Sequence, residues 1–388
     1  ALYDDWASYK GNGGQATLLF TPIIAEEFEK NPRGTLDSLM YLSRFSMTSL
    51  GEGDAWKDFN SVQHELLKYS NKYFDSPRLA KIIWELRCIT CKQFKKPKSL
   101  ELDFHGVSTG SVKSEDPHKP YTRSKKYVDS YFRGWITGHA EKPQLGSYDE
   151  NKCDYPLLVP KDVSRKRIIA MLSNTKAVAS KAIAKLLDKA VKRTYPHGII
   201  SEDDQTISQE LARVGSIDNS FVTVDHKNGS DRIVWTFFSR IVPTWVSKLL
   251  FPVLAEEYHD GHKKHKLCTF ALAGYSFTFL MECVVFASLA ELACQLAEAF
   301  GYKCYFVVVG DDLVISTEAY DIYVQLATMC GLKVNMKKTF ITGNFREACG
   351  GFYYKGQDVT PCRFTRKQIK LDKPNELSGD SFGSRTTS

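Results

Sequence analysis

The sequence predicts an α+β protein in which helices cover a sheet that contains an antiparallel hairpin. In the C-terminal half, short apolar runs typical of strands alternate with longer runs of helical periodicity. Two of these apolar runs, Tyr305 to Val309 and Leu313 to Ser316, are joined by Gly310-Asp311-Asp312 alone, which indicates a hairpin. The chain has 388 residues, 43% hydrophobic and 25% charged, which suits about two or three units with buried cores. This composition excludes disordered, collagen-like and disulfide-scaffold chains.

Helical periodicity predicts most of the elements in the N-terminal half. It marks the segments Ala25 to Phe28, Leu36 to Phe45 and Leu79 to Phe94, and a longer segment over residues 174 to 193. The stretch Gly106 to Arg123 is rich in Ser, Thr, Gly, Pro and Lys, and we expect an exposed basic loop there.

The C-terminal half carries clearer start and stop signals. Phe221 to Asp225 is a β-rich run, and the turn-like Asn228 to Asp231 precedes a helical pattern from Arg232. Further elements are a long helix over Phe277 to Ala299, a helix over Tyr320 to Cys330 closed by Gly331, and a hairpin-like turn over Lys355 to Asp358.

Membrane association and secretion are not predicted. The most apolar stretch, Phe277 to Phe300, is interrupted by Glu282, Glu291 and Glu298. Several of the ten cysteines lie inside apolar runs, where a free thiol packs as a small hydrophobic group, so the cysteine usage is consistent with a reducing compartment.

Positive charge is concentrated in one segment. The net charge of +7 is small for this length. The segment from Lys161 to Arg193, however, contains ten basic residues and only two acidic ones, Asp162 and Asp188. A local excess of this kind suits a polyanion such as nucleic acid or the phosphates of a nucleotide. The alternative is a solvated helix face, because lysines recur at 181, 185, 189 and 192.

The chemistry is expected at the predicted hairpin. Asp311 and Asp312 are adjacent carboxylates at its tip, and like charges placed side by side need open water or a cation. Asp225 ends another β-run 86 residues before Asp311. If the two strands are neighbours, the three carboxylates gather at one end of a sheet, which is the arrangement for two-metal attack on phosphorus. The alternative is a polar β-turn, in which Gly and Asp are favoured.

These pieces, in this order, resemble the palm of a viral RNA-dependent RNA polymerase, and more specifically the replicase of leviviruses, the positive-strand RNA bacteriophages. The most specific match is the block from Thr339 to Pro361, which contains Phe345-Arg346-Glu347-Ala348-Cys349-Gly350-Gly351 and Val359-Thr360-Pro361. Asp225-x5-Asp231, Val159-Pro160-Lys161 with Arg167, and Asp204 to Gln209 match as well. The resemblance runs in register from about Val159 to Pro361, and before it only Phe104-x-Gly-Val-Ser-Thr is similar.

The resemblance implies a right-hand polymerase fold of fingers, palm and thumb, with an antiparallel palm sheet. It places the N-terminal fingers region at residues 1–160 and a basic fingers segment over the nucleotide at 161–220. The palm follows at 221–341, and 342–388 form the palm–thumb junction and a truncated thumb, most of which is expected to be missing.

The resemblance also implies a role for each matched residue. Asp225, Asp311 and Asp312 would be catalytic and hold Mg²⁺, with Mn²⁺ as an alternative. Lys337 or Lys338 would protonate the leaving pyrophosphate; the sequence does not choose between them, and Lys337 is the one we predict. The residues expected to contact the nucleotide are Lys161, Arg165, Arg167, Asp231, Gly274 and Ser276, with Asp231 near the ribose 2′-hydroxyl. Those expected to contact RNA are Lys181, Lys185 and Thr278.

The implied function is replication of a viral positive-strand RNA genome by nucleotidyl transfer from ribonucleoside triphosphates. The implied partners are an RNA template and product, host elongation factors Tu and Ts, and a ribosomal protein, in the cytoplasm of an infected bacterium. Two alternatives remain open: a reverse transcriptase-like polymerase, and a catalytically inactive RNA-binding polymerase fragment.

The chain departs from the family at several motif positions. His226-Lys227 follows Asp225 where the family has a hydrophobic residue and Ser, and Tyr275-Ser276 stands where it has Asn and Gly. Ser164 replaces a basic residue, for which Arg165 or Lys166 would substitute.

Overall fold

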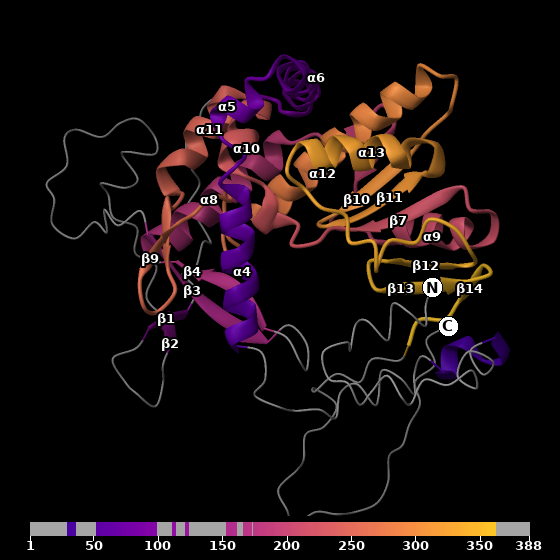
Figure 1. Cartoon of the computed structure of the whole chain (residues 1–388), viewed down its shortest axis with the longest axis horizontal. Coiled ribbons are helices and arrows are strands. Elements are labelled where there is room, and N and C mark those ends of the chain that lie inside the picture. Colours follow the sequence, from indigo (N-terminus) through magenta and orange to yellow (C-terminus); the bar gives the residue numbers. More distant parts are fainter. Residues whose placement is uncertain are drawn as a thin grey trace, which may run out of the picture.

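Figure 1 shows the computed structural model of the chain, which is a mixed α/β protein. The structure describes residues 29–35, 52–98, 111–113, 121–123, 153–160, 166–172 and 174–361. The helices expected at Ala25 to Phe28 and Leu36 to Phe45 lie outside the described residues, as does most of the expected thumb segment.

The described residues contain the helices that periodicity predicted there and several that it did not. They are α4 (Glu52–Leu66), α5 (Asn71–Phe74), α6 (Pro77–Gln93), α8 (Asn174–Ala190), α9 (Thr206–Asp218), α10 (Trp235–Ile241), α11 (Thr244–Leu250), α12 (Thr278–Glu298) and α13 (Thr317–Met329), with short 3₁₀ turns at Ser230–Arg232 and Phe251–Val253. The four longer helices predicted within these residues are therefore confirmed, whereas the pattern expected from Arg232 forms the two short helices α10 and α11.

The strands in the described part of the chain form four sheets. They are β1 (Ser111–Lys113), β2 (Tyr121–Arg123), β3 (Cys153–Pro160), β4 (Lys166–Met171), β5 (Thr194–Tyr195), β6 (Gly198–Ile200), β7 (Phe221–Asp225), β8 (Glu257–His259), β9 (Lys264–Lys266), β10 (Phe306–Val309), β11 (Asp312–Ser316), β12 (Phe345–Ala348), β13 (Gly351–Tyr354) and β14 (Gln357–Asp358). The sheet orders are β1-β2, β5-β6-β10-β11-β7, β12-β13-β14 and β4-β3-β8-β9.

The five-stranded sheet carries the predicted hairpin. β10 and β11 pair antiparallel, and β11 pairs antiparallel with β7, as the sequence predicts. The sheet as a whole is mixed, because β6 pairs parallel with β10. The prediction of an antiparallel sheet is therefore right for three strands and wrong for this fourth one. β5 and β6 have two and three residues, too few to show a period of two.

The sheet is buried on both faces. Along β11, Leu313 and Ile315 point into the large core that includes α12 and α13, while Val314 joins a smaller cluster with Ala212 of α9. This alternation is what the pleat of a strand requires. Figure 1 accordingly shows α12 and α13 on one side of β10, β11 and β7, and α9 on the other.

α12 is the central helix of the core. Apart from Phe279, its first seventeen side chains are all buried, so it is apolar on nearly all sides. Its length and composition also suit a membrane span, but 83% of its apolar window is packed inside the protein. A core helix of this kind explains both properties.

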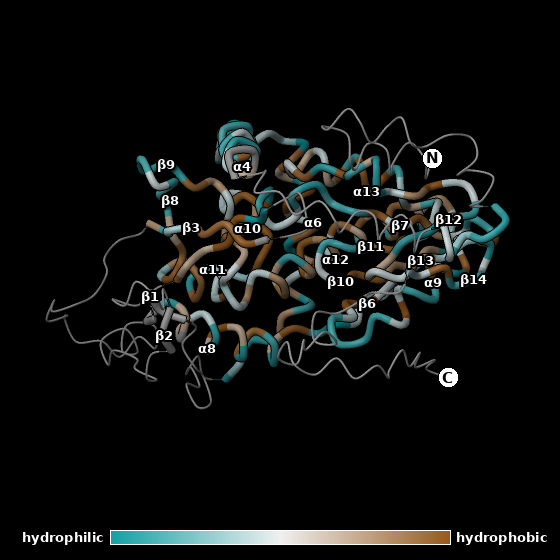
Figure 2. Tube along the Cα trace, turned by 90° about the horizontal axis from the view of Figure 1, so that it is seen from below, coloured by the Kyte–Doolittle hydropathy of each residue, from teal (hydrophilic) through white to brown (hydrophobic). Residues whose placement is uncertain are grey.

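Antiparallel strand pairs also form outside the five-stranded sheet. Within Gly106 to Arg123, where an exposed basic loop was expected, β1 and β2 pair antiparallel. β8 and β9 form a hairpin, and Tyr258 of β8 is buried against Trp56 and Phe59 of α4. In Figure 2 this hairpin is hydrophilic at its end, whereas hydrophobic segments run through the middle of the molecule.

A buried arginine joins the three-stranded sheet to β7. The Arg346 side chain in β12 is fully buried and donates to the carbonyls of Phe221, Ile341, Gly343 and Phe345 and to Oδ1 of Asn219, at 2.7 to 3.0 Å. Burial lowers the pKa of Arg346 to about 10. Because a buried guanidinium needs all of its donors satisfied, this network fixes β12 beside the start of β7.

Candidate active site

The predicted carboxylates lie at the same end of the five-stranded sheet. β7 ends at Asp225 and β11 begins at Asp312, and these two residues are directly opposite each other in the register of the two strands. Asp311 precedes Asp312 in the turn of the β10–β11 hairpin, and all three side chains are half-buried. The expectation that the two strands are neighbours is therefore confirmed.

The hairpin turn is attached to α12 through its glycine. Gly310 has φ of +63°, and a Cβ on it would lie 2.4 Å from the Phe279 ring, so only glycine fits without strain. Its N–H donates to Sγ of Cys283 at 3.0 Å. These contacts set the distance between the turn and the helix.

Hydrogen bonds orient the two opposed carboxylates. Nδ2 of Asn335 donates to Oδ2 of Asp225 at 2.7 Å, and the main chain of Asn335 donates to the Asp225 carbonyl at 2.8 Å. The N–H of Cys349 donates to Oδ2 of Asp312 at 3.0 Å. Asn335 and Cys349 come from the segments after α13 and β12, so the site is assembled from three separate parts of the chain.

The surroundings of Asp312 disfavour its charged form. Burial, followed by the neighbouring carboxylates Asp311, Asp225 and Glu347, raises the pKa of Asp312 to about 7, against the lowering effect of the Cys349 N–H. A bound cation would reverse this repulsion.

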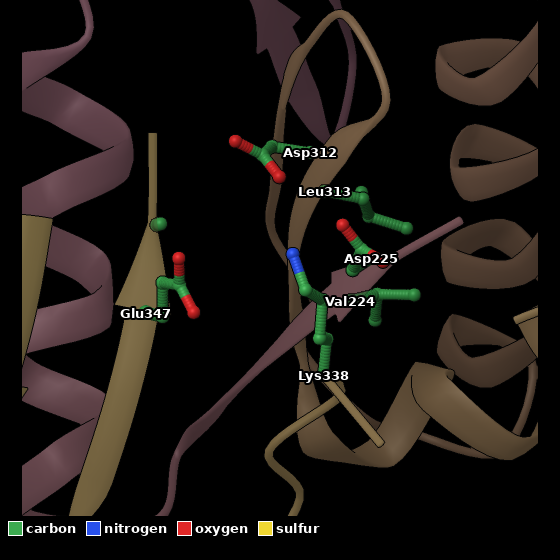
Figure 3. Close-up of a pocket in the computed structure, with 7 residues that line it drawn as sticks. Val224, Asp225, Asp312, Leu313, Lys338 and Glu347 are labelled. Carbon is green, nitrogen blue, oxygen red and sulfur yellow. The ribbon is translucent and has the colours of Figure 1, made fainter. Parts of the chain in front are cut away.

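A small hollow opens between these residues. It is lined by Val224, Asp225, Asp312, Leu313, Lys338, Glu347 and Ala348. Figure 3 shows the nitrogen of Lys338 directed toward the space that separates Asp225 and Asp312 from Glu347. Lys337, the predicted catalytic lysine, is exposed and does not line the hollow, so the placement favours Lys338 of the two lysines that the sequence left open.

Glu347 is a fourth carboxylate that the sequence reasoning did not select. It lies on β12, across the hollow from Asp312. The only signal for it was its position beside Arg346 in the motif block, because β12 and β11 are far apart in the sequence.

Another carboxyl group lies behind the turn. Glu282 of α12 is buried, and a Cβ on Gly229 would lie 2.4 Å from its Oε1 and 3.1 Å from Cβ of Asp311. Burial, and then the charges of Asp311 and Asp231, raise the pKa of Glu282 well above its usual range. Glycine at position 229 is therefore needed for Glu282 to approach the turn this closely.

The donor set suits a divalent cation, although the carboxylates do not converge on one point. Carboxylate oxygens are the ligands that Mg²⁺ and Mn²⁺ prefer. Among the described residues, no group of three or more His, Cys, Asp or Glu side chains is close enough together to hold a metal ion. Asp225 and Asp312 are nevertheless opposed in register, and the pKa of Asp312 is raised by burial and then by neighbouring carboxylate charges, which a bound cation would offset.

The residues expected to bind nucleotide and RNA belong to other elements than the strands that carry the carboxylates. Lys161 and Arg165 lie outside the described residues. Arg167 is exposed on β4, Asp231 is half-buried in the turn Ser230–Arg232, and Gly274 and Ser276 are exposed before α12. Lys181 and Lys185 are half-buried on α8.

Thr278, which was expected to contact RNA, is bonded within the protein. Its side chain is buried, and its hydroxyl donates to the Leu272 carbonyl at 3.1 Å. This hydrogen bond attaches the start of α12 to the loop before it.

A buried polar cluster holds the same loop. The hydroxyl of Tyr275 donates to both carboxylate oxygens of Asp154, at 3.0 and 2.8 Å, and Nζ of Lys176 donates to Asp154 at 3.2 Å. Tyr275 stands where the family has Asn, and here its hydroxyl is engaged by Asp154 of β3. The sequence showed that Tyr275 departs from the family pattern. It did not show that Asp154, 121 residues away, is the hydrogen-bond partner.

Carboxylates gathered at the ends of neighbouring strands, beside a lysine, are typical of sites that transfer phosphoryl groups with divalent metals. The family to which this chain belongs is RNA replicase, beta-chain, whose model matches residues 122–374, well over half of the chain. This finding confirms the resemblance deduced from the sequence.

Individual relatives agree with the family. The chain is 34% identical over 167 residues to the RNA-directed RNA polymerase subunit beta of Qbeta virus (strain MX1), covering 42% of this chain and 28% of that protein. It is 27% identical over 358 residues to the corresponding subunit of Enterobacteria phage SP, covering 85% of this chain and 60% of that protein. The chain thus spans less than two thirds of the length of these relatives.

Solved structures show a weaker likeness. The RNA-dependent RNA polymerase of BmCPV at its quiescent state matches with a TM-score of 0.40 and 11% identity, over 53% of this chain and 22% of that one. The RNA-dependent RNA polymerase of a human picorbirnavirus matches with a TM-score of 0.36 and 11% identity, over 54% and 45%.

Proposed function

We propose that this chain is the catalytic part of an RNA-dependent RNA polymerase that copies a viral positive-strand RNA genome. The observation that carries the proposal is the pairing of Asp225 with Asp312 in register, beside Lys338, in a chain of the replicase family. The reaction joins the 3′-hydroxyl oxygen of the growing RNA to the α-phosphorus of a ribonucleoside triphosphate, and the bond to pyrophosphate breaks.

Asp225 and Asp311, with Asp312 beside them, would hold Mg²⁺, for which Mn²⁺ can substitute. Bound there, divalent ions activate the attacking hydroxyl oxygen and stabilise charge on the transferring phosphoryl group. Asn335 and the Cys349 N–H keep the carboxylates of Asp225 and Asp312 oriented, so that less rearrangement is needed when the substrates bind.

Lys338 is the residue we assign to the leaving group. Its nitrogen faces the hollow between the carboxylates, so it is placed to donate a proton to the departing pyrophosphate. Lys337 is the neighbour predicted earlier, and its exposure makes it the natural comparison.

The substrates are assigned to residues around this site. Arg167, with Lys161 and Arg165, would contact the triphosphate, because guanidinium groups donate two hydrogen bonds to phosphate. Asp231, Gly274 and Ser276 would contact the nucleotide, with Asp231 near the ribose. Lys181 and Lys185 on α8 would contact the RNA backbone, which predicts salt-sensitive binding.

The domain assignment follows the same family pattern. Residues 1–160 would form the N-terminal fingers region, 161–220 the basic fingers segment, 221–341 the palm, and 342–388 the junction with the thumb. By resemblance, the partners would include host elongation factors Tu and Ts and a ribosomal protein, in the cytoplasm of an infected bacterium.

Nucleotide incorporation on a short RNA primer–template tests the proposal. The natural chain and Asp311→Ala are compared with Mg²⁺ or Mn²⁺, and with ribonucleotides or deoxyribonucleotides. We expect ribonucleotide extension that requires the metal and is lost in Asp311→Ala.

The other outcomes distinguish the alternatives. Extension with deoxyribonucleotides instead would indicate a reverse transcriptase-like enzyme. Extension that is equal in Asp311→Ala would mean that the site is wrongly assigned. Tight, salt-sensitive RNA binding without extension would favour an inactive RNA-binding polymerase fragment.

A further inference from the structure

His226 follows Asp225 and makes two short side-chain hydrogen bonds inside the core. Its ring is buried, with Nδ1 2.7 Å from the main-chain oxygen of Asp311 and Nε2 2.6 Å from the hydroxyl of Tyr323. A carbonyl oxygen only accepts, so Nδ1 carries the hydrogen and donates it. Burial lowers the pKa of His226 to about 4, and in the neutral ring Nε2 then accepts from Tyr323.

The ring plane of His226 is fixed by aromatic contacts. It stacks on Phe286 of α12 with centroids 3.9 Å apart and an angle of 6° between the planes. Tyr323 of α13 is fully buried and meets the same ring edge-on, at 5.8 Å and 74°. With both nitrogens bonded and one face covered, the imidazole cannot turn without losing these contacts.

The bond to Asp311 matters because Asp311 lies at the turn of the catalytic hairpin. Gly310 is already held by Cys283 and Phe279 of α12. His226 adds an attachment one residue further along, from the strand that carries Asp225. One residue therefore couples the main-chain positions of the two proposed metal ligands.

We propose that His226 is a positioning residue that holds the Asp311 main chain, and with it the catalytic hairpin, at a fixed place relative to Asp225. The inference rests on the proposed function, in which Asp225 and Asp311 hold a metal ion together. A hydrophobic residue at this position could not donate to the Asp311 carbonyl.

Three variants separate the hydrogen bonds from simple packing. His226→Leu removes both bonds and keeps an apolar side chain of similar size. His226→Asn keeps a donor near the position of Nδ1 and gives up the bond to Tyr323. Tyr323→Phe removes only the distal hydroxyl. Tyr320→Phe is the matched control, because Tyr320 is also a buried tyrosine of α13 but its hydroxyl faces Met336.

Two measurements are made on the full chain of each variant, after circular dichroism has shown that it is folded. The first is hydrogen–deuterium exchange in the peptide that covers Val309 to Leu313, without metal. The second is the affinity for Mn²⁺, measured by electron paramagnetic resonance, with Asp311→Ala as the reference for loss of the site.

We expect exchange at the hairpin to become about tenfold faster in His226→Leu, and Mn²⁺ affinity to fall by about tenfold, as for lost support of a metal ligand. Tyr323→Phe should change each by about fivefold or less, the size of one hydrogen bond. His226→Asn should restore most of both values, and Tyr320→Phe should leave both unchanged.

A purely structural role predicts a different result. Lower melting temperature in His226→Leu, with hairpin exchange no faster than elsewhere in the core and Mn²⁺ affinity unchanged, overturns the proposal. So does an effect in Tyr320→Phe as large as in Tyr323→Phe. If the natural chain binds no Mn²⁺ that depends on Asp311, the proposed metal site fails, and the exchange measurement still decides whether His226 holds the hairpin.

Discussion

Acidic side chains lie at both ends of the five-stranded sheet, but the groups that bind them differ between the two ends. At the N-terminal end of β6, Glu291 and Glu298 of α12 bind the two ring nitrogens of His197, at 3.0 and 2.9 Å. At the hairpin end, Asp225 and Asp312 are oriented by an amide and a main-chain N–H, and burial together with neighbouring carboxylates raises the pKa of Asp312 to about 7.

The difference distinguishes a cluster whose charges are matched within the protein from the proposed metal site. The His197 cluster contains its own group that can become cationic, so the two carboxylates have a partner within the protein. At the hairpin end the carboxylates repel one another, which is unfavourable unless a cation joins them. The comparison predicts that substitutions at the two ends affect different properties of the protein.

The largest effect is expected from Asp225→Asn. It keeps the size of the side chain and removes one metal-binding charge, so ribonucleotide incorporation should fall by on the order of 10³-fold, as when electrostatic stabilisation of a transition state is lost. Glu298→Gln at the opposite end is the control, and its incorporation rate should match that of the natural chain. Similar losses in both variants would contradict the comparison.

The next effect is expected from Lys338→Met. If Lys338 protonates pyrophosphate, kcat should fall by about 10²-fold, the lower end for general acid catalysis, while KM for the nucleotide changes little. Lys337→Met is the matched control and should retain nearly full activity, because Lys337 is exposed outside the hollow. A larger loss of kcat in Lys337→Met than in Lys338→Met would identify Lys337 as the general acid.

The smallest effect is expected at the other end, from His197→Gln, and it concerns stability. Burial disfavours the charged ring, but Glu291 and Glu298 outweigh it and raise the pKa of His197. A raised pKa in the folded state gives stability that is complete below the unfolded value of about 6.5 and is lost as the pH rises through the folded pKa. The natural chain should lose about 0.5–1 kcal/mol across that range, the size of a partly exposed ion pair.

Urea unfolding between pH 5.5 and 8.5 measures this dependence. His197→Gln should flatten it, while His64→Gln, at an exposed position on α4, should leave it in place. A slope that survives in His197→Gln would show that other groups cause it.

The sequence predicted the parts of the fold and site that depend on local patterns. The hairpin and β7 could be located because apolar runs end at turn residues, and the carboxylates at those ends follow from the same pattern. α8, α12 and α13 could be located because each repeats apolar residues over several helical turns.

The parts that were missed depend on contacts between distant segments. Lys337 and Lys338 are sequence neighbours, and only the tertiary position of their segment decides which one faces the carboxylates. Glu347 reaches the site because Arg346 fixes β12 beside β7. Tyr275 is turned into the core by Asp154, a residue whose own strand carries no signal for this contact.

The contact between Gly310 and Cys283 gives the protein a chemical reporter. The thiol of Cys283 is buried, and burial raises its pKa well above the usual range, so in the closed arrangement it is a poor nucleophile. Alkylating reagents will reach it only when the turn lifts away from α12. The rate at which Cys283 is alkylated should therefore measure how often the β10–β11 turn separates from α12, without an added probe.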